Sequence, residues 1–112
     1  MLPQVHRLRH EKDIKTLFAR GKSVFGSMVG IKIRPNSLPL SRFAVVAGVK
    51  VSKKAVVRNR LKRQVRAIIH EVLGNVRPGY DVLLFLKSSA VDKSFDDLKK
   101  EVLMGFKKSK LL

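Results

Sequence analysis

Cysteine is absent from this chain of 112 residues. That absence excludes a disulfide framework, a thiolate nucleophile and a metal site built on sulfur. Long apolar runs are also absent: the run VLLFL at residues 82–86 is among the longest, and a membrane span needs about 20 residues. The opening residues MLPQ lack the apolar core of a signal peptide. These features predict a cytoplasmic protein that is not embedded in a membrane.

Acidic residues are scarce, since 8 Asp and Glu stand against 25 Lys and Arg, for a formal net charge of +17. The segment from Lys15 to Arg66 contains 14 basic residues and no acid. A protein that needs charge only for solubility mixes the two signs, so this one-signed segment predicts a surface for a polyanion. Nucleic acid is the first candidate. Acidic lipid and an ordinary solvated surface are the alternatives.

The length and an apolar fraction of 45% predict a single domain over residues 1–112 with one modest core. Helices are expected at about 11–20, at about 54–73, and from Ser94 to about 108, with Ser94 as the N-terminal cap. Strands are expected within 23–34, interrupted by a turn at 26–27, then over 43–51 as a central strand, and over 80–87. The element order predicts an α+β protein in which three helices pack on a small sheet.

The middle helix has two contrasting faces. Its apolar residues form one narrow stripe, and the opposite face carries guanidinium, ammonium and amide groups. Arginine suits phosphate binding because its planar donors engage two oxygens at once. An ordinary solvated basic face normally carries Glu four residues from Lys or Arg, and no acid lies between Lys54 and Arg66. The pattern therefore favours a binding surface that comprises Arg58, Asn59, Arg60, Lys62, Arg63 and Arg66.

No catalytic constellation is visible in the sequence. Phosphodiester hydrolysis by a protein needs clustered carboxylates for metal ions, or a paired acid and base. Asp96 and Asp97 begin a helix, where capping explains them, and the other acids are scattered. His6 and His10 have the i, i+4 spacing of metal ligands but lie in a basic segment, and His70 is expected on a helix surface. The sequence therefore predicts no catalytic residue, no bound cofactor and no metal site in the protein.

The segment KKAVVRNRLKR at residues 53–63 resembles the signature of the bacterial ribonuclease P protein family. The motif Arg-Asn-Arg followed by Lys-Arg carries the resemblance, within a long basic helix that follows a strand. The similarity extends over nearly the whole chain. Residues 7–9 and the pattern from Phe18 to Lys22 resemble the family's first helix. Residues 80–86 resemble its last strand, and residues 97–108 its last helix.

The resemblance implies a fold and a function. The implied fold is an α+β sandwich like the second domain of ribosomal protein S5, with a small mixed sheet, three helices and a left-handed βαβ crossover. The implied function is that of the protein subunit of ribonuclease P. Such a subunit binds the catalytic RNA and the 5′ leader of precursor tRNA, and assists endonucleolytic removal of the leader. The hydrolysis then belongs to the RNA and its Mg²⁺ ions, in a complex with one protein per RNA.

Residue roles follow from the same resemblance. Lys50, Lys53 and Lys54, in the loop before the helix, join the six helix residues as candidates for RNA contact. Phe18 matches an aromatic residue that lines a leader-binding cleft, where base stacking contributes about 1–3 kcal/mol per base. A core position in an amphipathic helix is the alternative for Phe18. The chain has Ile14 and Ile31 where relatives place further aromatic residues, which predicts fewer stacking contacts in the cleft.

Two other functions compete with this interpretation. A structural RNA-binding protein, such as a ribosomal protein, would share the charge and the fold but would not prefer a precursor tRNA leader. A DNA-binding regulator is less consistent with the sequence, because no short helix-turn-helix pair is evident. A cationic membrane-active helix fits worst, because the apolar stripe is needed to pack on the sheet.

Overall fold

The computed structural model describes residues 3–112, and its centre is one mixed sheet in the order β1-β2-β4-β3. The strands span Lys22–Phe25 (β1), Val29–Pro35 (β2), Arg42–Val46 (β3) and Tyr80–Leu86 (β4). β2 is antiparallel to both β1 and β4, whereas β3 is parallel to β4. The chain passes between the two parallel strands through a helix, which forms a βαβ crossover.

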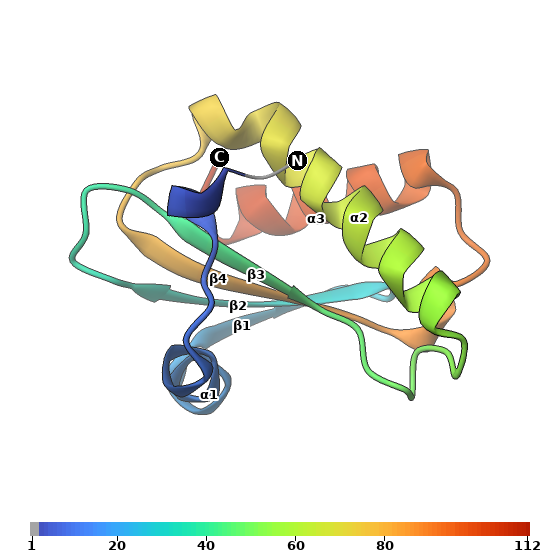
Figure 1. The fold of residues 1–112 in the computed structure, drawn as a ribbon. Helices are drawn as coiled ribbons and strands as arrows, with labels where there is room; N and C mark the ends of the chain where they lie inside the picture. The colour runs from blue at the N-terminus through green and yellow to red at the C-terminus, as the bar shows by residue number, and fades with distance from the viewer. Residues whose placement is uncertain (1–2) are drawn as a thin grey trace.

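Helices cover both faces of this sheet (Figure 1). α1 (Glu11–Arg20) lies on one face, and α2 (Ala55–Val72) lies beside α3 (Phe95–Lys108) on the other. Short 3-10 turns occupy Gln4–His6, Leu73–Asn75 and Ser88–Ala90. The predicted α+β class, with three helices and a small mixed sheet, is confirmed.

The main core lies between the sheet and the α2–α3 pair. Successive strand residues point to opposite faces, so β4 contributes Val82, Leu84 and Leu86 to this core and Leu83 to the α1 side. Both sets are buried, which explains why residues 82–86 form a continuous apolar run. From the helices, the buried residues are Leu61, Val65, Ile68, Ile69, Leu98, Val102 and Phe106.

The prediction of a central strand over 43–51 is wrong in two respects. β3 ends at Val46, and it lies at the edge of the sheet, while β4 occupies the central position. The β-branched run is broken by Gly48, where a turn forms with Val51 N–H donating to the Gly48 carbonyl at 3.0 Å. Val51 is nevertheless buried, because the turn directs it into the main core.

The outer edge of β3 is partly covered by the segment before α1. Arg7 forms a parallel bridge to Phe43, and Leu8 N–H donates to the Phe43 carbonyl at 2.7 Å. Leu8 itself is buried and joins Leu17, Ala44 and Leu83 in a second, smaller core beneath α1. Residues 7–9 therefore precede the first helix, which begins at Glu11, and do not form part of it.

Two predicted boundaries depend on identifiable local contacts. Ser94 caps α3, because its hydroxyl oxygen accepts a hydrogen bond from Asp97 N–H at 3.1 Å. α1 ends at Arg20, directly before Gly21.

Within residues 3–112, no helix combines the length and apolar character needed to cross a membrane.

Candidate RNA-binding surface

Four of the predicted RNA-contact residues form one basic face on α2. Leu61, Val65 and Ile68 pack the opposite side of the helix into the main core. This packing fixes the rotation of α2 and leaves the polar side exposed. There, a hollow of about 420 Å³ is lined by Asn59, Lys62, Arg63, Arg66 and Ala67. These residues are hereafter called the α2 basic face.

Arg58 and Arg60 flank this face, and each reaches a backbone carbonyl of a neighbouring loop. Arg58 donates to the Ser52 carbonyl at 2.8 Å, and Arg60 donates to the Val91 carbonyl at 3.1 Å. Each guanidinium has five N–H donors, so one such bond leaves donors for phosphate oxygens. The two arginines thus support the loops on either side of α2 as well as adding charge.

The loop before α2 extends the positive surface. Lys50, Lys53 and Lys54 are all exposed. Lys54 occupies the N-cap position of α2 without a side-chain hydrogen bond, and the first turn of the helix contains no acid. The positive end of the helix dipole and three ammonium groups therefore lie together, an arrangement that a bound anion stabilises.

A groove of about 290 Å³ lies between α1, β3 and α2. Ile14, Ala44 and Val46 contribute apolar side chains to it, and Arg7, Arg9 and Arg66 contribute guanidinium groups. Arg66 lines both this groove and the hollow on the α2 basic face. The basic face of α2 and the apolar groove are therefore one connected surface, consistent with the cleft that the family resemblance implies.

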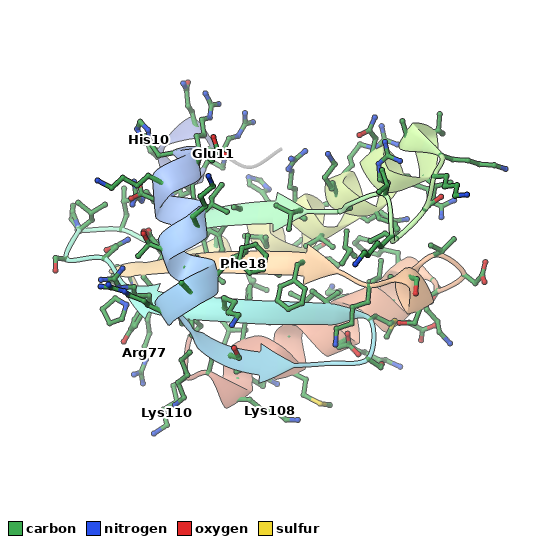
Figure 2. All side chains as sticks on the ribbon, turned by 90° about the horizontal axis from the view of Figure 1, so that it is seen from below. His10, Glu11, Phe18, Arg77, Lys108 and Lys110 are labelled. Atoms are coloured by element: carbon green, nitrogen blue, oxygen red, sulfur yellow. The ribbon has the colours of Figure 1, made fainter. Side chains whose placement is uncertain are left out.

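An aromatic pair lies next to this groove. Phe18, at the C-terminal end of α1, is 45% exposed, which excludes the alternative that it is a core residue. Figure 2 shows its position beside α1, over the strands of the sheet. Its ring centroid lies 5.8 Å from that of Phe85, and Phe85 is the β4 partner of Val46, which lines the groove.

Ile31 does not line the cleft, so this part of the prediction is wrong. It is 2% exposed and belongs to the main core beneath α3, where Gly105 leaves room for its side chain. Strand alternation gives the reason, because Ile31 pairs with Leu84 and points away from α1. Its neighbour Lys32 is the β2 partner of Leu83 and occupies the α1 side. Ile14, by contrast, does line the groove.

Acidic groups are engaged away from the α2 basic face. Asp81 accepts two hydrogen bonds from Arg42, at 2.9 and 2.8 Å, and Asp13 of α1 lies 3.7 Å from the same guanidinium. Hydrogen bonding and charge attraction from Asp81 raise the pKa of Arg42, so this arginine keeps its charge. Glu71 pairs with Lys99, and this pairing raises the pKa of the Lys99 ammonium. Within residues 3–112, none of the eight predicted RNA-contact cations forms an ion pair.

Residues 3–112 contain no group of three or more His, Asp or Glu side chains placed to hold a metal ion. His6 is committed to the fold, since its Nδ1 donates to the Ser41 carbonyl at 2.8 Å. His70 is exposed on α2, as expected.

Sequence reasoning missed three contributors to this surface. Arg9 and Arg7 line the groove because the segment before α1 pairs with β3, a long-range contact that local patterns do not reveal. The sequence predicts Phe85 only as part of a buried strand. Strand alternation, however, places its side chain on the opposite face of the sheet from that of Leu84, beside α1. The alternation of strand side chains between the two faces of the sheet, applied to residues 80–86, was the one sequence signal that could have indicated the position of Phe85.

Comparisons with known proteins agree with this architecture. The family model described as Ribonuclease P matches residues 2–110. The ribonuclease P protein component of Microcystis aeruginosa is 38% identical and covers 90% of this chain and 88% of its own. That of a Synechocystis strain is 32% identical and covers 99% of this chain and 90% of its own.

Solved structures show the same fold. The ribonuclease P protein of Thermotoga maritima superposes with a TM-score of 0.79 at 29% identity, over 87% of this chain and 91% of that chain. The Staphylococcus aureus protein superposes with a TM-score of 0.87 at 19% identity, over 95% of this chain and 96% of that chain. The sequence matches and the shared fold together establish that this chain belongs to the ribonuclease P protein family, the protein subunits of the ribonuclease P ribonucleoprotein.

Proposed function

We propose that this protein binds the catalytic RNA of ribonuclease P through the α2 basic face and the loop before it. In the same complex, the groove beside α1 takes the single-stranded 5′ leader of precursor tRNA. The observation that carries the proposal is the position of Arg66, which lines both the hollow on α2 and the groove. One continuous surface can then hold two RNA segments at once.

The two parts of this surface differ in their chemistry. The α2 basic face and the lysines before it offer charged donors, which suit phosphate groups and contribute affinity that falls steeply with salt. The groove offers apolar side chains beside arginine, and the Phe18–Phe85 pair lies next to it. Single-stranded RNA is recognised in this way, since its bases stack on rings while its backbone follows the positive charge.

Catalysis in this proposal belongs to the RNA. Mg²⁺ ions held by the RNA would supply the activation of the attacking water and the stabilisation of the leaving oxygen. The protein contributes binding energy and screens the repulsion between substrate and RNA phosphates. We propose that one protein acts per RNA and per precursor tRNA, in the bacterial cytoplasm.

Affinity for substrates with and without a leader tests the proposal. The ribonuclease P RNA is assembled with and without the protein, and binding of precursor tRNA is compared with binding of mature tRNA. The protein is expected to strengthen binding of the precursor and to leave binding of the mature tRNA nearly unchanged. Equal strengthening of both would contradict a leader-binding groove. Tight binding to ribosomal RNA without any effect on precursor tRNA would favour a structural RNA-binding role.

A further inference from the structure

Arg77, in the loop before β4, is fixed by hydrogen bonds from two distant segments. Its backbone N–H donates to the Leu111 carbonyl at 2.9 Å, and its own carbonyl accepts from the Ser41 hydroxyl at 2.6 Å. Ser41 is 3% exposed and is the one buried polar residue among those described. The Ser41 hydroxyl oxygen also accepts from Tyr80 N–H at 3.1 Å. These bonds hold the backbone of Arg77 in one place, while its side chain is exposed.

Lys110 follows α3 in a backbone conformation that glycine normally occupies. Its φ is +64°, and two bonds close the turn around it. Lys110 N–H donates to the Lys107 carbonyl at 3.1 Å, and Leu111 N–H donates to the Phe106 carbonyl at 2.8 Å. This pair of bonds defines a helix C-terminal cap whose left-handed residue is usually glycine. Lysine is strained there because its Cβ atom crowds the backbone, and strain of this kind points to a function for the side chain.

The bond from Arg77 to Leu111 places this arginine beside the end of α3, where Lys108 and Lys110 are also exposed. Figure 2 shows the three residues on the same side of the molecule, toward the lower left of that view. They are hereafter called the C-terminal cluster. Within residues 3–112, none of the three side chains forms an ion pair or a hydrogen bond. Two carboxylates of the same elements, Asp81 of β4 and Glu101 of α3, accept hydrogen bonds from other groups.

Lysine near a helix C-terminus is ordinarily explained by the helix dipole. That explanation covers Lys108, which lies in the last turn of α3. It does not cover the strained Lys110, which lies beyond the helix, or Arg77, which comes from a different loop. Neighbouring cations without acidic partners repel one another, and the phosphates of a polyanion relieve this repulsion. The C-terminal cluster therefore has the chemistry of a site for a phosphodiester backbone.

The position of the cluster distinguishes it from the RNA-binding surface already described. The loop before α2 and the loop that carries Arg77 lie at opposite ends of this helix of 18 residues, which is about 27 Å long. The cluster is instead connected to the groove beside α1. Arg7 lines the groove, and the preceding residue, His6, hydrogen-bonds the carbonyl of the same Ser41 whose hydroxyl binds Arg77. RNA that leaves the groove past Arg7 is therefore directed toward the cluster.

We propose that the C-terminal cluster binds phosphates of single-stranded RNA upstream of the leader segment that the groove holds. The inference rests on the proposed function and adds to it a second binding site on the precursor. Ammonium and guanidinium groups that bind phosphates do not read bases, so the site requires RNA of sufficient length and no particular sequence. A precursor whose leader ends within the groove does not reach the cluster, whereas one with a long leader does.

Leader length is the variable that tests the proposal. Precursor tRNAs whose leaders are lengthened one nucleotide at a time are bound to ribonuclease P RNA assembled with the parent protein or with the double variant Arg77→Gln with Lys110→Gly. With the parent protein, affinity is expected to rise again once the leader extends beyond the groove. The double variant is expected to lose this second rise. For long leaders, it is also expected to reduce the slope of log affinity against log salt concentration by about 1.4, the equivalent of two lost phosphate contacts on a single strand.

Two further variants separate binding from folding and from net charge. Lys110→Gly removes the ammonium group and relieves the left-handed strain, so it is expected to melt at the parent temperature or higher and still to weaken binding of long leaders. The double variant Lys93→Gln with Lys100→Gln is the matched control, because it removes the same charge at exposed positions before α3 and in its first half. This control is expected to keep the second rise in affinity.

The outcomes distinguish the C-terminal cluster from the proposed function. A second rise in affinity that persists in the double variant of Arg77 and Lys110, or that is absent with the parent protein, would overturn the cluster and leave the proposed function intact. Equal losses in the Lys93 and Lys100 control would also overturn it, because net charge alone would then explain them. If the parent protein does not favour precursor over mature tRNA at any leader length, the proposed function itself fails.

Discussion

Glu101 of α3 is the residue that fixes the β1–β2 turn. Its carboxylate accepts hydrogen bonds from Ser27 N–H at 2.9 Å, the Ser27 hydroxyl at 2.8 Å, Met28 N–H at 2.8 Å and Val29 N–H at 2.6 Å. An ionised carboxylate has enough lone pairs for all four. Local sequence patterns do not show this contact, because Glu101 and Ser27 are 74 positions apart.

Glu101→Gln is expected to lower the free energy of unfolding by about 1–3 kcal/mol, because an amide NH₂ would face backbone N–H donors and leave them unsatisfied. Urea unfolding followed by circular dichroism measures the change. Glu71→Gln is the matched control: its ion pair with Lys99 is well exposed, so about 1 kcal/mol or less is expected. Equal effects of the two substitutions would contradict the role assigned to Glu101.

Some residues of the candidate site can be assigned from the sequence alone. The residue types on α2 sufficed to predict its basic face, because helical periodicity places Asn59, Lys62, Arg63 and Arg66 opposite the apolar stripe. Helical periodicity did not separate Arg58 and Arg60 from the residues of the α2 basic face, because their hydrogen bonds to neighbouring loops depend on the tertiary fold. In β2, the family resemblance assigned Ile31 to the cleft, whereas strand alternation places Ile31 in the main core and its neighbour Lys32 on the α1 side.

At the scale of elements, α1 is the least embedded helix. It contacts the sheet through a small core in which Leu17 is the only α1 residue that is fully buried among those described. Its predicted bounds were accurate because the apolar spacing and Gly21 are local signals. The strand predicted over 43–51 is longer than β3, because the β-branched residues favour a strand more strongly than Gly48 indicates a turn. The edge position of β3 could not be predicted from local patterns, since it depends on pairing between residues distant in sequence.

Leu17→Ala is expected to destabilise the protein by about 2–5 kcal/mol through the cavity that it leaves. Hydrogen exchange is expected to show loss of protection in residues 11–20 before any loss in α2 and α3, since the main core is untouched. Lys12→Ala, at an exposed position of the same helix, is the control and is expected to change stability by less than about 0.5 kcal/mol. Uniform loss of protection would indicate that the two cores unfold together.

At the scale of the whole molecule, charge is the dominant feature. The formal net charge is +17, and the ion pairs of the described residues that involve Arg42, Lys15 and Lys99 leave the α2 basic face uncompensated. Self-repulsion of this kind opposes the compact state. An anion that binds the folded protein and not the unfolded chain offsets it.

Sulfate is therefore expected to raise the melting temperature relative to chloride at matched ionic strength. Circular dichroism melts in the two salts measure the shift, which is expected to grow with sulfate concentration as binding linkage requires. Replacement of Lys62, Arg63 and Arg66 by Gln is expected to reduce the shift. Identical melting curves in the two salts would contradict specific anion binding by the folded protein.

The most direct measurement is cleavage of precursor tRNA by a bacterial ribonuclease P RNA at low magnesium, with and without this protein. The parent protein is expected to restore cleavage. The triple variant with Arg58→Gln, Arg60→Gln and Arg63→Gln is expected to abolish this rescue. A second triple variant, with Lys107, Lys108 and Lys110 changed to Gln, removes the same charge at the far end of α3 and is expected to retain most of the effect. Absence of any rescue by the parent protein, or equal loss in the two triple variants, would contradict the account.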